Sequence, residues 1–272
     1  MKTIFIAIAI IFTHVSLFAQ HSLEKLWQTD TVLTTPESAL LAANGQFLYV
    51  SNIGSAQKER SGYISKVAPG GKIITREWVT GLNAPKGLGL YKGLLYAAEL
   101  TAVAVIDVKT GTIVRRIPIE GAQMLNDITI DAKGVVYVSD SKANKIHKIE
   151  NGRPSLYLEN MDNANGLLAV GPALYALTNG KLLKIDAQKN PTIIAEGLEG
   201  RTDGLVQVRE NEFIVSGWQG IIYYVKADGT KQVLLDTRDQ KSNTADIGYN
   251  AVAQTLYVPT FFKNTIVAYR LK

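Results

Sequence analysis

Six polar or charged side chains recur at one position of a repeated sequence pattern, and their types suit the binding of a cation or a polar substrate. In the stretch LNDITIDAKGVVYVSDSKANKIHKIENG this position is Asn126, at the start of the first of three alternating segments. A single Asn before a strand is most often part of a turn. A recurring set is harder to attribute to turn chemistry alone; its members are Glu37, Lys86, Asn126, Asn165, Asp203 and Asp246.

Four members of this set, Glu37, Asn126, Asn165 and Asp203, offer two carboxylates and two amide carbonyls. Such an oxygen-only ligand set suits Ca²⁺, Mg²⁺ or Mn²⁺ better than zinc or copper. Two carboxylate charges also match one divalent ion, and waters or a substrate oxygen would complete the coordination shell.

Lys86 in the same column opposes a bound cation, and three interpretations stay open. Asp246 and Glu37 can neutralise its charge while the metal still binds. Alternatively, Lys86 binds the substrate or the oxyanion that develops during a reaction. In the third interpretation Lys86 replaces the metal electrostatically, and the protein is not catalytic.

The elements that must position this column are short strands, because apolar and polar residues alternate between turn residues along the whole chain. Six in-phase units can be aligned, and each continues into a third alternating strand. The first five units add a fourth strand, whereas the sixth stops at Lys272. An unassigned strand in Glu24–Leu33 would supply the missing one by pairing with the last unit.

This organisation predicts an all-β fold, a six-bladed β-propeller with four-stranded antiparallel blades, whose ring is closed by the N-terminal strand. The first strand of each blade lies nearest the axis, so equivalent residues form a ring at one level. An open β-sandwich or two small β domains is the alternative, which six in-phase units disfavour.

Composition and the N-terminal segment limit the classes of protein that need to be considered. The chain has 272 residues, 46% hydrophobic and 19% charged, which is typical of a globular protein. Residues 1–19 have the form of a signal peptide, which leaves residues 20–272 as one domain of an exported protein, periplasmic or secreted. We expect no stable membrane span after cleavage, and the absence of cysteine excludes disulfides and thiol catalysis. The formal charge of +5 is scattered, which speaks against a nucleic-acid partner; the oligomeric state stays open.

The signatures TPES, LNDITID, ANGLL and TDGL, in this order, resemble the senescence marker protein (regucalcin), gluconolactonase and luciferin-regenerating enzyme family. The resemblance covers nearly all of the chain after residue 19. It implies a six-bladed β-propeller with one divalent metal at the channel mouth, Ca²⁺ first, with Mg²⁺, Mn²⁺ or Zn²⁺ as alternatives. The ligands it implies are Glu37, Asn126, Asn165 and Asp203, and Asp203 is also the implied catalytic base.

Lactone hydrolysis fits these residues, because a metal ion polarises an ester carbonyl and a carboxylate beside it takes a proton from water. No serine nucleophile is required, and the sequence shows no G-x-S-x-G motif. We therefore expect a metal-dependent hydrolase acting on a small-molecule lactone or related ester. The alternatives are a non-catalytic propeller that binds a ligand or partner, and condensation of the strictosidine synthase type.

Strand direction places the ends of the second strands near the metal, and this predicts further pocket residues. Met124 stands where animal gluconolactonases carry a substrate-binding Arg, which favours a less polar lactone or ester. Together with Lys86 and Asp246, the substrate-pocket candidates are Met124, Glu99, Asp140, Trp218, Phe261 and Phe262. Each of the three aromatic residues has packing between blades as its alternative role.

Overall fold

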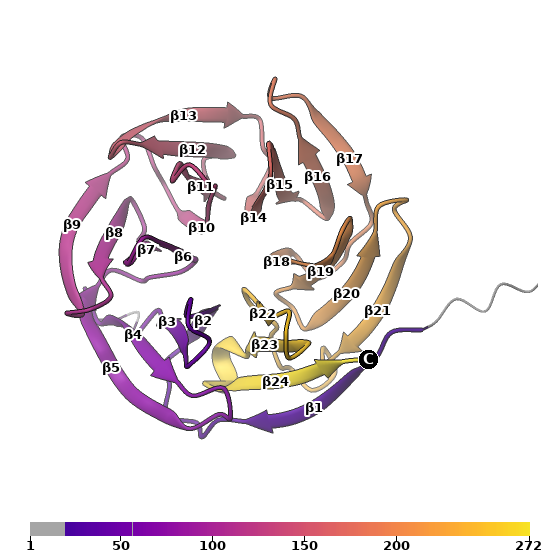
Figure 1. Cartoon of the computed structure of the whole chain (residues 1–272), viewed down its shortest axis with the longest axis horizontal. Coiled ribbons are helices and arrows are strands. Elements are labelled where there is room, and N and C mark those ends of the chain that lie inside the picture. The colour runs from indigo at the N-terminus through magenta and orange to yellow at the C-terminus, as the bar shows by residue number, and fades with distance from the viewer. Residues whose placement is uncertain (1–19, 56) are drawn as a thin grey trace, which may run out of the picture.

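The computed structural model of the protein describes residues 20–55 and 57–272, which form six four-stranded antiparallel sheets arranged around a central axis (Figure 1). The predicted fold, an all-β six-bladed propeller, is confirmed. The predicted signal peptide lies outside the described residues. No helix within those residues has the length and hydrophobicity to cross a membrane.

Each blade runs from an inner strand beside the axis to an outer strand at the rim. The first three blades consist of β2 (Pro36–Leu41), β3 (Leu48–Asn52), β4 (Gly62–Val67) and β5 (Ile73–Leu82); β6 (Leu88–Tyr91), β7 (Leu94–Ala98), β8 (Ala102–Asp107) and β9 (Thr112–Pro118); and β10 (Leu125–Ile130), β11 (Val136–Asp140), β12 (Lys145–Glu150) and β13 (Arg153–Glu159). The last three consist of β14 (Ala164–Val170), β15 (Ala173–Thr178), β16 (Lys181–Ile185) and β17 (Pro191–Ala195); β18 (Thr202–Arg209), β19 (Glu212–Gly217), β20 (Ile221–Lys226) and β21 (Lys231–Asp236); and β22 (Gly248–Asn250), β23 (Thr255–Pro259), β24 (Ile266–Leu271) and β1 (Leu23–Gln28). A single 3₁₀ turn, η1 (Phe261–Lys263), joins β23 to β24.

Short hairpins connect the strands where the sequence supplies residues that tolerate a left-handed backbone. Asn151 and Gly152 between β12 and β13 have φ of 51° and 72°, and Asn179 and Gly180 between β15 and β16 have φ of 41° and 77°. Two consecutive positive φ angles are the geometry of a type I′ turn, whose twist matches that of the flanking strands. The Asn-Gly pairs therefore fix these two hairpins.

The sixth blade is assembled from both ends of the described chain. β1 pairs antiparallel with β24, with Leu23 opposite Leu271 and Gln28 opposite Val267. The strand order in this sheet is β1-β24-β23-β22, so the N-terminal segment forms its outermost strand (Figure 1). This pairing joins the first and last parts of the ring through main-chain hydrogen bonds.

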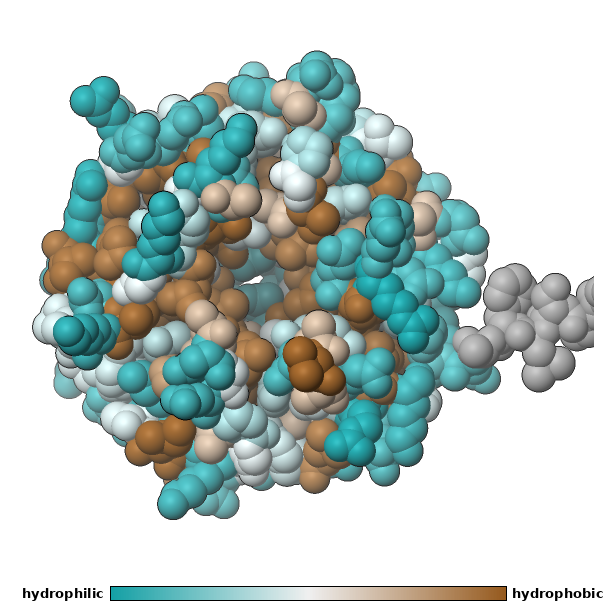
Figure 2. Space-filling view, in the orientation of Figure 1, coloured by the Kyte–Doolittle hydropathy of each residue, from teal (hydrophilic) through white to brown (hydrophobic). Residues whose placement is uncertain are grey.

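The hydrophobic core is divided among the contacts between neighbouring blades. Six clusters of buried apolar residues occur in the described chain, and each draws its side chains from two adjacent blades. In one of them Tyr175 of the fourth blade packs on Phe213 of the fifth, with ring centroids 4.8 Å apart. Burial of apolar surface therefore holds each blade to the next, and the inner strands are left to line a channel. Figure 2 shows the ring face-on, with a hollow at its centre among largely hydrophobic residues.

Candidate functional site

The six residues of the polar column lie at the start of the inner strands, and a local irregularity separates four of them from the other two. In the blades of Glu37, Asn126, Asn165 and Asp203, the register of the inner strand shifts by one residue at the column position. The shift is a β-bulge, which bends the strand and re-aims a side chain. The inner strands after Lys86 and Asp246 start later, at Leu88 and Gly248, and pair without a shift.

Three of these bulges are stabilised by a serine from the neighbouring second strand. The hydroxyl of Ser51 accepts the N–H of Ser38 at 3.0 Å, and the hydroxyl of Ser139 accepts the N–H of Asp127 at 2.8 Å. Ser216 accepts the N–H of Gly204 in the same way at 2.8 Å. These main-chain donors lie in the interior, where an unpaired N–H would be costly. The serine hydroxyls therefore satisfy backbone N–H groups that the bulges would otherwise leave unpaired. In this way they allow the bulges that present the column residues.

A pocket of about 210 Å³ opens over this level of the ring. It brings together eight residues predicted for the site, namely Glu37, Lys86, Met124, Asn126, Asn165, Asp203, Trp218 and Phe261. Glu37 and Asp203 are each only 3% exposed, and Asn126 is 8% exposed. The pocket therefore combines buried polar groups at its base with Met124 and aromatic rings on its walls.

The two amides turn their nitrogen atoms toward protein acceptors. Asn126 Nδ2 donates to Ser141 Oγ at 3.0 Å, and Asn165 Nδ2 donates to Asp203 Oδ1 at 2.9 Å. Asn165 Oδ1 is buried and has no hydrogen-bond partner in the described chain, and the same holds for Glu37 Oε2. Buried acceptors without a donor are rare and call for a partner. A divalent cation satisfies an amide carbonyl and a carboxylate together, so the residues fit such an ion.

The donor set is a mixed one. The described residues contain no group of three or more His, Cys, Asp or Glu side chains arranged to hold a metal. An ion at this level would therefore depend on the amide carbonyls of Asn126 and Asn165 as much as on the carboxylates of Glu37 and Asp203. This is a set typical of Ca²⁺ rather than of zinc.

Burial strongly perturbs the acids around the pocket. Burial raises the pKa of Asp203 to about 7, with Asp246 adding to the rise, while Lys86 and the hydrogen bond from Asn165 lower it. Burial likewise raises the pKa of Glu37 well above its usual range, against the lowering effect of Lys86. Carboxylates that lose water and face one another disfavour the charged form. A nearby cation would reverse this effect, because it stabilises the ionised carboxylates.

Lys86 lies within the ring and contacts one of the predicted ligands. Its Nζ is 3.7 Å from Glu37 Oε1, and its side chain is 13% exposed. The Lys86 ammonium therefore pairs with one oxygen of Glu37, while the second oxygen of that carboxylate has no hydrogen-bond partner among the residues that the structure describes. The contact is compatible with each of the three roles predicted for Lys86.

Asp246 faces a different part of the channel. Its Oδ2 accepts a hydrogen bond of 2.5 Å from Ser38 Oγ, and burial raises its pKa to about 7. With Ser38 and Asp127 it lines a second cavity, of about 500 Å³, whose other walls are mostly aliphatic residues of the inner strands. Asp246 is thus near the column level but outside the pocket that contains Lys86.

Two further candidates, Glu99 and Asp140, also lie outside the 210 Å³ pocket, where both carboxylates fix the backbone of loops. Glu99 accepts the N–H of Asn83 at 2.7 Å and pairs with Arg116 at 3.0 Å. Asp140 accepts the N–H groups of Gln123 and Met124, at 2.8 and 3.0 Å. Asp140 thereby holds the segment that leads into Asn126, and Glu99 the one that leads toward Lys86.

The aromatic candidates form one cluster at the mouth. The Trp218 ring lies 5.4 Å from Phe261 and 5.9 Å from Phe262, and the two phenylalanine rings are 4.7 Å apart. Phe262 is 66% exposed and does not line the pocket. The cluster therefore presents Trp218 and Phe261 to the pocket and Phe262 to the surface.

Four lining residues were not among the named candidates, namely Ser141, Asn163, Arg201 and Thr202, although Ser141 lies in the loop after β11 that was expected near the metal. Arg201 and Asn163 stand two positions before a column residue, and so do Thr35 and Ala84. All four have positive φ, between 49° and 57°. This left-handed position, which costs a non-glycine residue energy, recurs in the structure, but its four residue types have nothing in common, so the sequence carried no signal for Arg201.

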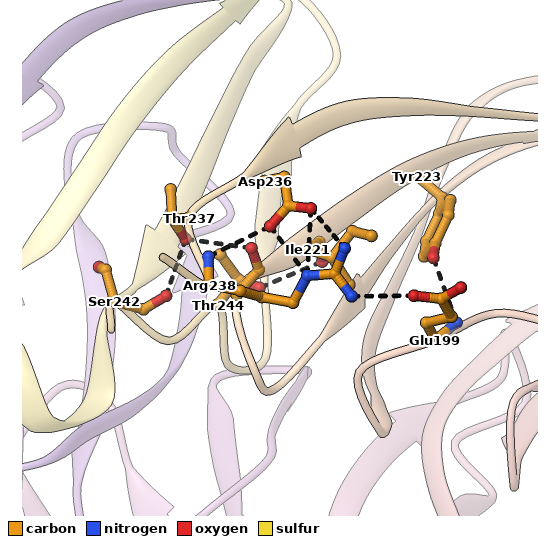
Figure 3. A network of polar contacts seen from close by, with 9 residues as sticks. Glu199, Ile221, Tyr223, Asp236, Thr237, Arg238, Ser242 and Thr244 are labelled. Atoms are coloured by element: carbon orange, nitrogen blue, oxygen red, sulfur yellow. Dashed lines mark hydrogen bonds and ion pairs between the residues drawn. The ribbon is translucent and has the colours of Figure 1, made fainter. Parts of the chain in front are cut away.

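A polar network fixes the loops on either side of the fifth blade (Figure 3). Arg238 Nη1 donates to Glu199 Oε2 at 2.8 Å, and its Nε donates to Asp236 Oδ1 at 2.9 Å. Thr237 Oγ1 donates to the carbonyl of Ser242 at 2.7 Å (Figure 3). Arg238 thereby joins the loop before Thr202 to the loop after β21, although its pairs lie at the surface and each adds little stability.

The same network reaches the pocket wall. Thr244 Oγ1 donates to the carbonyl of Gly217 at 2.8 Å, and Asn243 Nδ2 donates to the carbonyl of Trp218 at 2.8 Å. The N–H of Trp218 in turn donates to the carbonyl of Arg201 at 2.8 Å. These contacts hold the backbone of Trp218 and Arg201 from both sides.

Comparisons with known proteins extend the description of the fold. No protein-family model matches the sequence, and no curated protein matches it. The structure is similar to a gluconolactonase from Xanthomonas campestris, with a TM-score of 0.73 and 15% identity over 96% of this chain and 94% of the other. It is also similar to a streptogramin B lyase (TM-score 0.69, 13% identity, 93% of this chain and 98% of the other). A virginiamycin B lyase from Staphylococcus aureus gives a TM-score of 0.66 at 12% identity, over 92% of this chain and 99% of the other.

At these identities the similarity shows the fold and does not transfer an activity. The chain thus shares the six-bladed β-propeller of gluconolactonases and of streptogramin-type lyases, over nearly the full length of each.

Proposed function

We propose that the protein is a metal-dependent hydrolase of a lactone or related ester, with one divalent ion, Ca²⁺ first, held by Glu37, Asn126, Asn165 and Asp203. The observation that carries this proposal is the pair of buried acceptors, Glu37 Oε2 and Asn165 Oδ1, that have no hydrogen-bond donor in the described chain. The gluconolactonase among the structural neighbours supports the same class of substrate. The predicted signal peptide favours a periplasmic or secreted location.

When bound, a divalent ion supplies Lewis-acid polarisation of the ester carbonyl. Asp203 is the base: one of its oxygens is engaged by Asn165, and the other takes a proton from the attacking water and returns it to the alkoxide oxygen that leaves when the ester C–O bond breaks. Lys86, beside Glu37, adds a positive charge next to the oxyanion that develops on the substrate. Met124, Trp218 and Phe261 surround the rest of the substrate and favour a less polar lactone over a sugar lactone.

The test begins with metal binding by the chelator-treated protein, titrated calorimetrically with Ca²⁺, Mg²⁺, Mn²⁺ and Zn²⁺ beside an Asp203→Ala variant. Each metal-loaded sample is then assayed on a panel that includes gluconolactone and alkyl lactones. We expect stoichiometric binding that is lost in Asp203→Ala, together with turnover of the alkyl lactones. A preference for gluconolactone would contradict the proposed substrate polarity, and binding without any turnover would contradict the hydrolase.

The contact between Lys86 and Glu37 is also what a second candidate requires, a propeller that binds a ligand or partner without turning it over. In that case the Lys86 ammonium stands in place of the ion. A Lys86→Gln variant distinguishes the two candidate functions. If the ammonium replaces the metal, the natural protein binds no divalent ion and Lys86→Gln gains binding. If the protein is a metal-dependent hydrolase, the natural protein already binds the ion and Lys86→Gln loses turnover.

A further inference from the structure

We propose that the substrate carries a carboxylate in addition to its scissile ester, and that Arg201 binds this carboxylate at the mouth of the pocket. The proposal rests on the hydrolase function, because it names the substrate class of the same site. The proposed substrate differs from a neutral lactone in one respect: it carries a fixed negative charge away from the ester bond that reacts.

Arg201 is a free cation in the lining of the pocket. Its guanidinium makes no hydrogen bond or ion pair with the described residues, whereas Arg116 and Arg238 are both paired with carboxylates. Its backbone is nonetheless fixed, because its carbonyl accepts the N–H of Trp218 at 2.8 Å and its φ is 57°. An anchored backbone with an unpaired guanidinium is suited to meet an anion that arrives from solution.

The summed charge of the polar column supports an anionic ligand beside Arg201. Glu37, Asp203 and Asp246 carry −3 when ionised and Lys86 carries +1, which gives −2 in all. One divalent ion brings these four groups to neutrality. The nearby Asp127 carboxylate is engaged by the N–H groups of Ile128 and Leu167 and lines the larger cavity, so no carboxylate of the described residues pairs with Arg201. Arginine binds a carboxylate through two parallel N–H bonds, which is stronger and more directional than a neutral hydrogen bond.

The two cations of the pocket belong to opposite sides of the ring. Lys86 precedes β6, and Arg201 precedes β18, on the other side of the axis (Figure 1). Lys86 pairs with Glu37 at the base, so it is placed for the reacting carbonyl. Arg201 belongs to the rim, so a group that it binds lies at the far end of the substrate from that carbonyl.

The neighbours of Arg201 indicate what joins the two ends of the substrate. Trp218 is hydrogen-bonded to the backbone of Arg201, and its ring packs against Phe261 at 5.4 Å. An apolar or aromatic body between the ester and the carboxylate would contact these rings. The ligand class is therefore an apolar lactone or ester acid rather than a polyhydroxylated lactone.

The experiment compares one aryl-alkyl lactone in two forms, with a free carboxylate and with that carboxylate as a methyl ester, on the metal-loaded protein. We expect the free acid to have a KM lower by about 10- to 100-fold, the range of a charge-assisted hydrogen bond. Arg201→Gln should abolish this difference with kcat nearly unchanged, and Arg201→Lys should restore part of it. Arg153→Gln, on the outer strand β13, is the matched control and should behave as the natural protein.

A binding measurement separates this inference from the proposed function. Calorimetry with 3-phenylpropionate and the neutral 3-phenylpropanamide needs no turnover, and we expect only the acid to bind, with the affinity lost in Arg201→Gln. Arg201-dependent binding of the acid without hydrolysis of any lactone supports the anion site and overturns the hydrolase. Hydrolysis of both lactone forms with equal KM, unaffected by Arg201→Gln, overturns the anion site and leaves the hydrolase standing.

Discussion

The two ends of the central channel differ in size and in the side chains that line them, although four inner strands, β2, β10, β14 and β18, contribute to both. The candidate site encloses about 210 Å³ between buried acids, amides and aromatic rings. The opposite cavity encloses about 500 Å³, and most of its walls are aliphatic, with Leu40, Ile128 and Leu205 among them. The acids and amides are thus concentrated at the smaller, polar end, where four inner strands bulge, although Asp127 and Asp246 also line the larger cavity. The bulges, rather than the strands as a whole, therefore create the site.

The largest expected effect follows from removing a charge at the polar end. Asp203→Asn keeps the shape and the contact with Asn165 but removes a negative charge from the ligand set and removes the base, so we expect kcat/KM to fall by at least about 1,000-fold. Metal binding should weaken by about 10- to 100-fold, measured by calorimetry. Asp239→Asn, at an exposed residue, is the control and should change neither quantity. An Asp203→Asn enzyme with near-normal activity would break the link between the polar end and the chemistry.

Two glycines of the inner strands allow a comparison of how tightly backbone and side chains pack around them. A Cβ on Gly204, beside Asp203, would lie 2.4 Å from the backbone nitrogen of Ile247, whereas a Cβ on Gly89 in the apolar cavity would meet the side chains of Ile128 and Ile130. Backbone cannot yield as a side chain does, so we expect Gly204→Ala to cost roughly 3 kcal/mol or more of unfolding free energy and Gly89→Ala about 1 kcal/mol. Urea denaturation of both variants measures this, and equal costs would show that the side chains of Ile128 and Ile130 yield no more readily than backbone.

The raised pKa values of the buried acids predict how the stability of the metal-free protein depends on pH. The pKa values of Asp203 and Asp246 are about 7 in the fold and near 3.8 when unfolded, so the folded state holds these protons more tightly. Their contribution to stability is present below about pH 4 and is lost as pH rises through 7. We expect the Tm of chelator-treated protein to fall by roughly 5 °C between pH 5.5 and 8.5.

Two samples test the origin of this pH effect. Asp246→Asn removes one of the two groups, so its Tm should depend less on pH than that of the natural protein. Saturating Ca²⁺ should also reduce the fall, because the ion favours the ionised carboxylates. A Tm that rises with pH in the metal-free protein would show that the acids are ionised without a cation.

The smallest expected effect concerns the aromatic rim. Trp218→Ala removes a ring from the pocket wall, and we expect KM for an apolar lactone to rise by about 10-fold while metal affinity stays constant. Phe262→Ala changes a ring of the same cluster that does not line the pocket, so its KM should change less than about twofold. If the two variants are equally impaired, the cluster acts as a unit rather than through its pocket face.

Periodicity in the sequence was sufficient to predict the propeller and the level of the polar column, because strand alternation and turn residues are local signals. The bulges at Asn126 and Asp203 were not predictable in this way, since they depend on a register with the second strand and on serines such as Ser139 and Ser216. Glu99 and Asp140 illustrate the remaining limit. A carboxylate at the end of a strand either faces a pocket or binds the N–H groups of its own loop, and the sequence does not distinguish these outcomes.

The pairing of β1 with β24 has a consequence for how the protein reaches its native state. The sixth sheet cannot be completed until residues from both ends of the domain have met, so its formation depends on the most distant contacts in the chain. During synthesis β1 must wait for β24 to emerge, and its unpaired edge is meanwhile open to pairing with other chains. The ring closure that stabilises the finished propeller is thus also the step at which its folding is most open to delay and to misassembly.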